Sequence, residues 1–115
     1  MRALVADDDA NNREIVRRLL ARLGTACDEA RDGDEAVAKA RAAAASGSPY
    51  DLLFLDIGMP GLDGLAAARL LRAEGLPSRL VALSGHDDDP AIAEAGFDGF
   101  IQKPLTIEAL RRFVG

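Results

Sequence analysis

Several residue types that carry structural or targeting roles are scarce in this sequence. It has one cysteine (Cys27), no tryptophan, four phenylalanines and one tyrosine. A single cysteine excludes an internal disulfide, and the few aromatics leave most of the core packing to Leu, Val, Ile and Ala. No apolar run approaches the roughly 20 residues that a membrane helix needs, and no basic segment leads into an apolar stretch at the start. We therefore expect a cytoplasmic protein without a membrane partner.

An excess of basic residues is missing as well. The chain has 14 Lys and Arg against 19 Asp and Glu, which gives a net charge of -5. With no dense Lys/Arg cluster, this balance argues against a direct nucleic-acid partner. A length of 115 residues, with 49% hydrophobic and 29% charged side chains, is typical of one soluble domain. We expect residues 1–115 to form that single domain.

The hydrophobic pattern alternates between strand-like runs and helix-like spacings. The predicted strands are 3–6, 25–30, 52–55, 80–83 and 99–102. The predicted helices are one with an Asn11–Glu14 capping pair that ends at Gly24, one from Gly33 to about Ser46, one over 62–73, one from Pro90 to Gly96 capped by Asp89, and one capped by Thr106. This alternation with short connections predicts an α/β fold, a parallel sheet covered on both faces.

Polar residues stand where the predicted strands end, and these residues are Asp7, Asp8, Asp56, Ser84 and Lys103. The carboxyl ends of parallel strands share one edge of the sheet, so residues far apart in sequence could meet there. Three carboxylates in one place repel one another, and a hard divalent cation with oxygen ligands holds them ionised. We therefore predict a Mg²⁺ site at Asp7, Asp8 and Asp56, with the main-chain carbonyl of Gly58 as a further ligand.

Asp56 has the best position for covalent chemistry. It ends the most apolar strand and precedes a loop rich in Gly and Pro, which lets backbone amides approach an anion. A carboxylate beside such a cation can attack phosphorus and form an aspartyl phosphate. Lys103 would neutralise the phosphoryl oxygens, and the Ser84 hydroxyl would donate to one of them.

Other polar or reactive side chains have simpler interpretations. Asp9 is expected to cap the helix that follows it, and 87–89 to cap a helix and solvate a loop. His86 is a loop histidine without a Gly-x-Ser-x-Gly elbow beside it, so serine hydrolase chemistry is not favoured. Cys27 has no basic neighbour in sequence that would lower its pKa, and it is expected to be structural.

The ordered set of motifs resembles the receiver domain of two-component response regulators, over essentially the whole chain. The matching elements are Asp7-Asp8, Asp56-x-x-Met59-Pro60-x-x-Asp63-Gly64, Ser84 and Lys103-Pro104. The resemblance implies a flavodoxin-like (βα)5 three-layer sandwich with sheet order 2-1-3-4-5 and Mg²⁺ at the acidic cluster. It also implies that Asp56 accepts a phosphoryl group from the phosphohistidine of a histidine kinase or phosphotransfer domain, and that the domain later hydrolyses it.

The resemblance further implies a conformational switch. Ser84 would turn toward the new phosphate and Phe100 would change rotamer, which alters the surface of the fourth helix, fifth strand and fifth helix. Phe100 stands where Tyr is frequent and has no hydroxyl to offer a partner. Gly58 and His86 occupy positions that influence the lifetime of the phosphoryl group. The Lys103–Pro104 peptide bond is expected to be cis.

Two other functions stay open. A receiver-like interaction module that takes no phosphate is disfavoured by the intact acidic residues and Lys103. A Mg²⁺-dependent phosphatase of the haloacid dehalogenase type would need an Asp-x-Asp-x-Thr motif, which is absent after the first strand. The segments "NNREIVRRLL" and "DGFIQKPL" are similar to receivers of hybrid histidine kinases, so a kinase or output domain could be covalently attached. We expect a monomer that could dimerise on phosphorylation, with no turnover of an external substrate.

Overall fold

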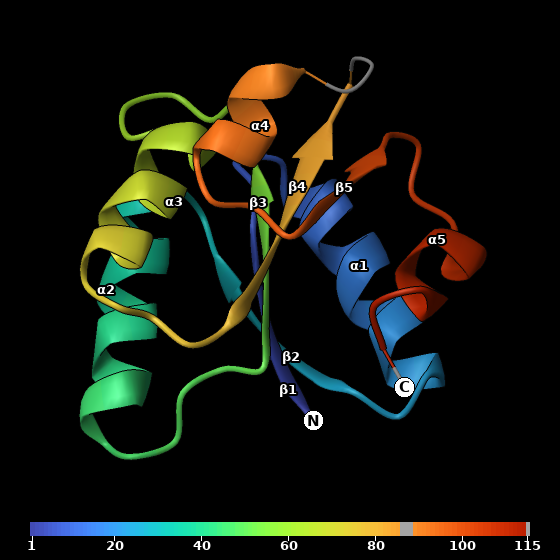
Figure 1. The fold of residues 1–115 in the computed structure, drawn as a ribbon. Coiled ribbons are helices and arrows are strands. Elements are labelled where there is room, and N and C mark those ends of the chain that lie inside the picture. Colours follow the sequence, from blue (N-terminus) through green and yellow to red (C-terminus); the bar gives the residue numbers. More distant parts are fainter. Residues whose placement is uncertain (86–88, 115) are drawn as a thin grey trace.

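A parallel sheet runs through the middle of the molecule (Figure 1). The computed structural model describes residues 1–85 and 89–114, and in these residues the sheet has the strand order β2-β1-β3-β4-β5. The strands are β1 (Arg2–Ala6), β2 (Ala26–Ala30), β3 (Leu52–Asp56), β4 (Arg79–Ser84) and β5 (Gly99–Gln102). The predicted α/β fold and the sheet order implied by the resemblance are confirmed, and each predicted strand end lies within one residue of its observed position.

Helices cover both faces of this sheet (Figure 1). One face is covered by α1 (Ala10–Arg22) and α5 (Ile107–Arg111), the other by α2 (Gly33–Ala45), α3 (Gly64–Ala73) and α4 (Pro90–Glu94). Every strand pairs in parallel with its neighbours, so the carboxyl ends of all strands lie at the same edge. Of the helices in the described part of the chain, none has the length and apolar character to cross a membrane.

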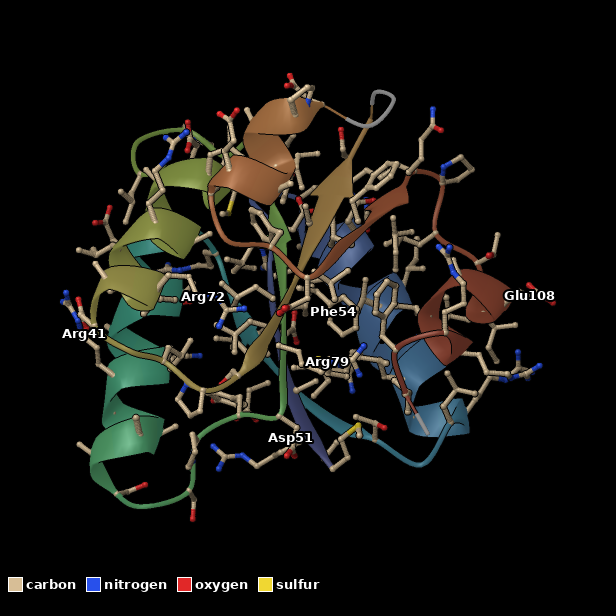
Figure 2. The ribbon with its side chains drawn as sticks, in the orientation of Figure 1. Arg41, Asp51, Phe54, Arg72, Arg79 and Glu108 are labelled. Atoms are coloured by element: carbon tan, nitrogen blue, oxygen red, sulfur yellow. The ribbon has the colours of Figure 1, made fainter. Side chains whose placement is uncertain are left out.

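The core consists of two layers because successive side chains of a strand point to opposite faces. Leu53 and Leu55 of β3 pack with α2, α3 and α4, whereas Leu52 and Phe54 pack with α1 and α5. Figure 2 shows Phe54 at the centre of the molecule, where it is fully buried. With both sheet faces covered, the central strands are apolar except at their ends. The buried carboxylate of Asp56 at the end of β3 therefore needs an explanation.

Three helix starts illustrate how local sequence sets the connections. Asp89 and Thr106 cap α4 and α5 as predicted, since each side chain accepts a hydrogen bond from a backbone N–H of the first turn. Asp63 caps α3 in the same way, so this helix begins at Gly64, two residues later than predicted. This short delay leaves residues 57–63 as a loop directly beyond the end of β3.

The predicted Asn11–Glu14 capping pair of α1 is wrong. The cap is Asp9, whose carboxylate accepts a hydrogen bond from the Asn11 backbone N–H at 2.8 Å. Asn11 is therefore already inside the helix, and Glu14 pairs instead with Arg18 at 2.9 Å. The prediction that Asp9 itself acts as a cap is confirmed. Only three residues, 7–9, connect β1 to α1.

The difference in burial predicts that replacing Leu53 or Leu70 by alanine lowers the free energy of unfolding by very different amounts. Leu53 is 0% exposed and Leu70 on the outer side of α3 is 38% exposed. We expect Leu53→Ala to lower the free energy of unfolding by about 2–5 kcal/mol, because it leaves a cavity, and Leu70→Ala to lower it by less than about 1 kcal/mol. Urea denaturation of both variants measures the difference. Equal losses would contradict the packing described here.

Candidate functional site

Three carboxylates and one ammonium group meet at the carboxyl edge of the sheet. Oxygen atoms of Asp7, Asp8 and Asp56 all lie within 4.8 Å of one another. The Nζ atom of Lys103 lies 3.1 Å from Asp7 Oδ2 and 3.2 Å from Asp56 Oδ2. Asp7 and Asp56 are buried, while Asp8 is exposed. The structure thus brings together four residues that the sequence places at three different strand ends.

The strand register explains why Asp7 and Asp56 are neighbours. In the pairing of β1 with β3, Ala6 lies opposite Leu55. The next residue of each chain segment is an aspartate, so both carboxylates leave the sheet side by side. Lys103 follows β5 at the edge of the sheet, and its long side chain reaches back to both of them. The attraction between the Lys103 ammonium group and the two carboxylates stabilises the site.

The backbone around Asp56 is arranged for an anion. The Gly58 N–H donates to Asp56 Oδ1 at 2.9 Å. The start of α3 passes very close behind, because a Cβ at Gly64 would lie only 2.5 Å from the main-chain oxygen of Asp56. Real Cβ atoms do not approach a backbone oxygen that closely, so glycine is required at this position. Gly64 therefore lets the helix start pack against the residue that carries the carboxylate.

The side-chain charges of the site influence one another. Burial of the carboxyl group raises the pKa of Asp56, and the nearby charge of Asp7 raises it further, while the Gly58 N–H and Lys103 act in the opposite direction. Burial of the ammonium group tends to lower the pKa of Lys103, but its hydrogen bonds and charge interactions with Asp7 and Asp56 prevail and raise it. Lys103 is accordingly charged at neutral pH.

The donor set fits a hard divalent cation. At about 4 Å and an effective dielectric constant of about 20, two like charges repel by about 4 kcal/mol. With all three carboxylates ionised, Lys103 alone leaves an excess of negative charge. Mg²⁺ typically binds one or two protein carboxylates and keeps several waters. Asp8 is exposed, so the site is open to solvent on that side and can accommodate these waters. That the carbonyl of Gly58 joins this set stays a prediction.

The remaining predicted residues lie along β4, β5 and the loops that follow them. Ser84 is buried at the end of β4, and its carbonyl accepts the backbone N–H of Lys103 at 2.7 Å. Phe100 on β5 is partly buried and packs against the cluster beneath α4. The Lys103–Pro104 peptide bond is cis, as the resemblance implied. The predictions for His86, Asp87 and Asp88 lie outside the described residues.

One residue that touches the site was missed in the sequence. Arg13 in the first turns of α1 donates from Nη1 to the main-chain carbonyl of Asp7 at 2.7 Å. Its Nε also bonds Glu29 Oε1 of β2 at 3.1 Å. The only available signal was an arginine five residues after an acidic pair at a strand end, a spacing that does not by itself indicate a contact. The Asp9 N–H adds a bond to Asp7 Oδ1 at 2.9 Å.

Together the fold and the site define a class, namely flavodoxin-like domains with an acidic cluster and a lysine at the carboxyl edge of the sheet. The chain belongs to the response regulator receiver domain family, whose model matches residues 3–114. This match covers β1 from Ala3 onward, the other four strands and the four residues of the cluster. It identifies the chain as a receiver domain of two-component signalling.

Similar proteins occur both as separate regulators and within kinases. The two-component response regulator ORR41 of Oryza sativa subsp. japonica is 40% identical over 115 residues, which cover 96% of this chain and 88% of that protein. The osmosensing histidine protein kinase SLN1 of Saccharomyces cerevisiae is 36% identical over 110 residues, which cover 91% of this chain but 9% of the kinase. The chain thus spans most of one relative and a small part of the other.

A solved receiver domain has a similar structure over most of this chain. The receiver domain of the histidine kinase CKI1 from Arabidopsis thaliana, complexed with Mg²⁺ and BeF₃⁻, has a TM-score of 0.80 with this chain at 27% identity. The alignment covers 97% of this chain and 88% of that one. The two domains therefore share their fold over nearly their full length.

The close approach at Gly64 can be tested against Gly58, a glycine in the loop that precedes α3. Helix propensity alone would favour Gly64→Ala by up to about 1 kcal/mol, but the clash with Asp56 should reverse the sign and lower the free energy of unfolding by about 1–3 kcal/mol. A Cβ at Gly58 meets only Asp56 Oδ1, at 3.6 Å, so Gly58→Ala should change stability by less than about 0.5 kcal/mol. Denaturant titration of both variants measures this, and a stabilising Gly64→Ala would contradict the packing.

Cys27 lies on β2, and its surroundings suppress its reactivity. Burial raises the pKa of its thiol to about 12, and the charges of Asp28 and Glu29 act in the same direction. Contrary to the sequence-based expectation, a basic neighbour exists in Arg17, but its effect is smaller. The expected structural role of Cys27 is consistent with this burial.

The raised pKa predicts slow alkylation of Cys27. At pH 8 the thiolate fraction should be on the order of a thousandfold below that of a free cysteine with a pKa of about 8.5. Reaction of the folded protein with iodoacetamide should be slower than that of the urea-unfolded protein by a similar factor. Mass spectrometry of timed aliquots gives both rates. Similar rates in the two states would refute the raised pKa.

Proposed function

We propose that this domain, residues 1–115, accepts a phosphoryl group on Asp56 from a phosphohistidine and releases it again by hydrolysis. The observation that supports the proposal best is the position of Asp56. One of its carboxylate oxygens lies within 4.8 Å of carboxylate oxygens of Asp7 and Asp8, and Oδ2 lies 3.2 Å from the Lys103 ammonium nitrogen. Membership of the receiver family agrees with this role.

The proposed transfer is a substitution at phosphorus. A carboxylate oxygen of Asp56 attacks the phosphorus, so that a P–O bond forms while the P–N bond of the phosphohistidine breaks. The imidazole nitrogen leaves with the electron pair of that bond and takes a proton from water. Hydrolysis later returns the Asp56 carboxylate and inorganic phosphate. Water is the only co-reactant of the hydrolysis, and no atom changes its oxidation state in either step.

Named residues would carry the separate tasks. Asp7, Asp8 and Asp56 would hold Mg²⁺, with the Gly58 carbonyl as a further ligand, and the bound ion would offset negative charge on the incoming group. Lys103, now paired with Asp56, would bind a phosphoryl oxygen as a point charge. The Ser84 hydroxyl would donate to another oxygen. Gly58 and His86 stay our proposed influences on the lifetime of the phosphorylated form.

The output would be a change in the surface of α4, β5 and α5. Phe100 packs against the cluster beneath α4 and stands three residues before Lys103, so a change at the end of β5 has a short path to that surface. Phosphorylation would replace the single negative charge of the Asp56 carboxylate by up to two on the phosphoryl group, and it would add strong acceptor oxygens at the site. The partners would be a histidine kinase or phosphotransfer domain as donor, and an effector or attached kinase domain as target. Phosphorylation could also bring about dimerisation.

Phosphoryl acceptance can be measured directly by intact mass. After incubation with acetyl phosphate and Mg²⁺, the protein should gain the mass of one phosphoryl group, and hydroxylamine should remove it. Asp56→Asn should show no gain, and neither should the unchanged protein in the presence of a chelator. Asp63→Asn is the matched control from the loop that follows Asp56, because asparagine caps helices as well as aspartate, and it should still be phosphorylated.

Two results would overturn the proposal. One is an undiminished gain of mass in Asp56→Asn. The other is a folded protein that binds Mg²⁺ but gains no phosphoryl group from acetyl phosphate or from a phosphohistidine donor. That second result would instead favour the interaction module that takes no phosphate.

A further inference from the structure

We infer that Arg13 is a positioning residue of the acidic site: its guanidinium group fixes the backbone of Asp7 so that the three carboxylates converge on a divalent cation. The inference rests on the proposed function in that it concerns the same site. It adds a residue from α1 that neither binds the cation nor touches the reacting atoms. Its effect would pass entirely through Asp7.

The contacts of Arg13 connect three elements of the fold. Nη1 donates to the Asp7 carbonyl at 2.7 Å at the end of β1, and Nε donates to Glu29 Oε1 at 3.1 Å on β2. Its own backbone N–H donates to the Asp9 carbonyl at 3.1 Å in the first turn of α1. The side chain is only 14% exposed. A guanidinium donates through several N–H groups in a rigid plane, so it can hold two acceptors in a fixed relation.

Helix geometry explains how this side chain reaches backward. Side chains of an α-helix lean toward the helix N-terminus, and Arg13 is the fourth residue of α1. A long side chain there can extend past the cap to residue 7. Glu29 lies opposite Val5 in the pairing of β1 with β2, two residues before Asp7. Glu29 on β2 therefore binds the guanidinium group from the strand beside β1, the strand that leads to Asp7.

Asp7 is the residue for which this support matters most. The connection from β1 to α1 has three residues, and the Asp7 side chain already accepts the Asp9 N–H at 2.9 Å and the Lys103 ammonium at 3.1 Å. A rotation of the Asp7 backbone would move its carboxylate and that of Asp8 together. Groups that orient metal ligands without binding the metal commonly contribute tenfold to hundredfold in metal affinity.

The direction of the change in Mg²⁺ affinity on removal of Arg13 distinguishes a positioning role from a simple effect of its charge. Arg13 is a cation close to a site that binds a cation, so by charge alone its removal should tighten Mg²⁺ binding or leave it unchanged. Loss of a positioning contact should weaken Mg²⁺ binding instead. The two explanations predict opposite directions.

Arg17 offers a matched control on the same helix. Its polar contacts in the described part of the chain are with Glu29 at 3.5 Å and Glu14 at 3.9 Å. It thus shares the charge, the helix and the Glu29 contact of Arg13, but its side chain makes no bond to Asp7 there. Arg13→Lys is a second comparison, because it keeps the charge but replaces the planar fork by one nitrogen.

The experiment compares Mg²⁺ affinities of the full chain by isothermal titration calorimetry at about 0.15 M salt, where long-range charge effects are screened beyond about 8 Å. We expect Arg13→Ala to bind Mg²⁺ about tenfold more weakly than the unchanged protein, Arg13→Lys to be intermediate, and Arg17→Ala to be unchanged. Thermal unfolding confirms that the variants are folded. In phosphorylation assays, the Mg²⁺ concentration for half-maximal rate should rise about tenfold in Arg13→Ala, with the rate at saturating Mg²⁺ within about threefold.

A metal-free measurement accompanies the titration. Amide hydrogen exchange at Asp9, whose N–H bonds the Asp7 carboxylate, should be faster in Arg13→Ala than in Arg17→Ala. Mg²⁺ binding by Arg13→Ala that is as tight as in the unchanged protein, or tighter, would overturn the inference. Equal exchange rates at Asp9 in the two variants would overturn it as well, and so would the absence of Mg²⁺ binding by the unchanged protein.

These readouts are distinguishable from failure of the proposed function. Affinity and exchange are measured without any phosphoryl donor. A protein that binds Mg²⁺ but accepts no phosphoryl group would remove the proposed function and leave the comparison of Arg13→Ala with Arg17→Ala fully informative.

Discussion

Repulsion between carboxylates at one edge of the sheet is the constraint on which this structure depends. Asp7 and Asp56 must lie side by side because β1 and β3 are neighbours in register, and both are buried. Such an arrangement is unfavourable by itself: burial is the main cause of the raised pKa of Asp56, and the nearby charge of Asp7 raises it further. It persists because the strands that carry these residues are held by fully buried apolar side chains on both faces, and because Lys103 pairs with both carboxylates.

The same unfavourable charge arrangement makes the site suited to bind a cation and to react with a phosphoryl group. A cluster with more negative than positive charge attracts a divalent cation, and a cation beside a carboxylate favours attack on a phosphoryl group. Under the proposed function, the new phosphoryl group competes for Lys103, which at present bonds Asp7 and Asp56. Phe100 lies on β5, the strand that leads to this lysine, and Ser84 ends the neighbouring β4, where its carbonyl accepts the Lys103 backbone N–H. A local exchange of partners at the end of β5 therefore has a direct connection to the surface around α4.

The strand positions could be predicted because both faces of the sheet are covered, so that each strand is a short apolar run with polar residues after it. Periodicity does not contain the order of the strands, and the order 2-1-3-4-5 came from the resemblance alone. Helix starts were less certain where several caps compete, and in the run Asp7-Asp8-Asp9-Ala10-Asn11 the cap proved to be Asp9. The contact of Arg13 depends on a side chain that reaches back six residues to a carbonyl, and no local pattern encodes it.

The two cations at this site have different geometries, and the difference suggests different tasks. Lys103 bonds carboxylate oxygens, the atoms that a metal ion or a phosphoryl group would also approach, and a single ammonium on a flexible stem can change partners. Arg13 bonds a main-chain carbonyl and leaves those carboxylate oxygens available. Its planar group is held from a second side by Glu29, which suits a contact that does not change. Under the proposed function, Lys103 would respond to the chemistry, and Arg13 would keep the backbone of Asp7 in position.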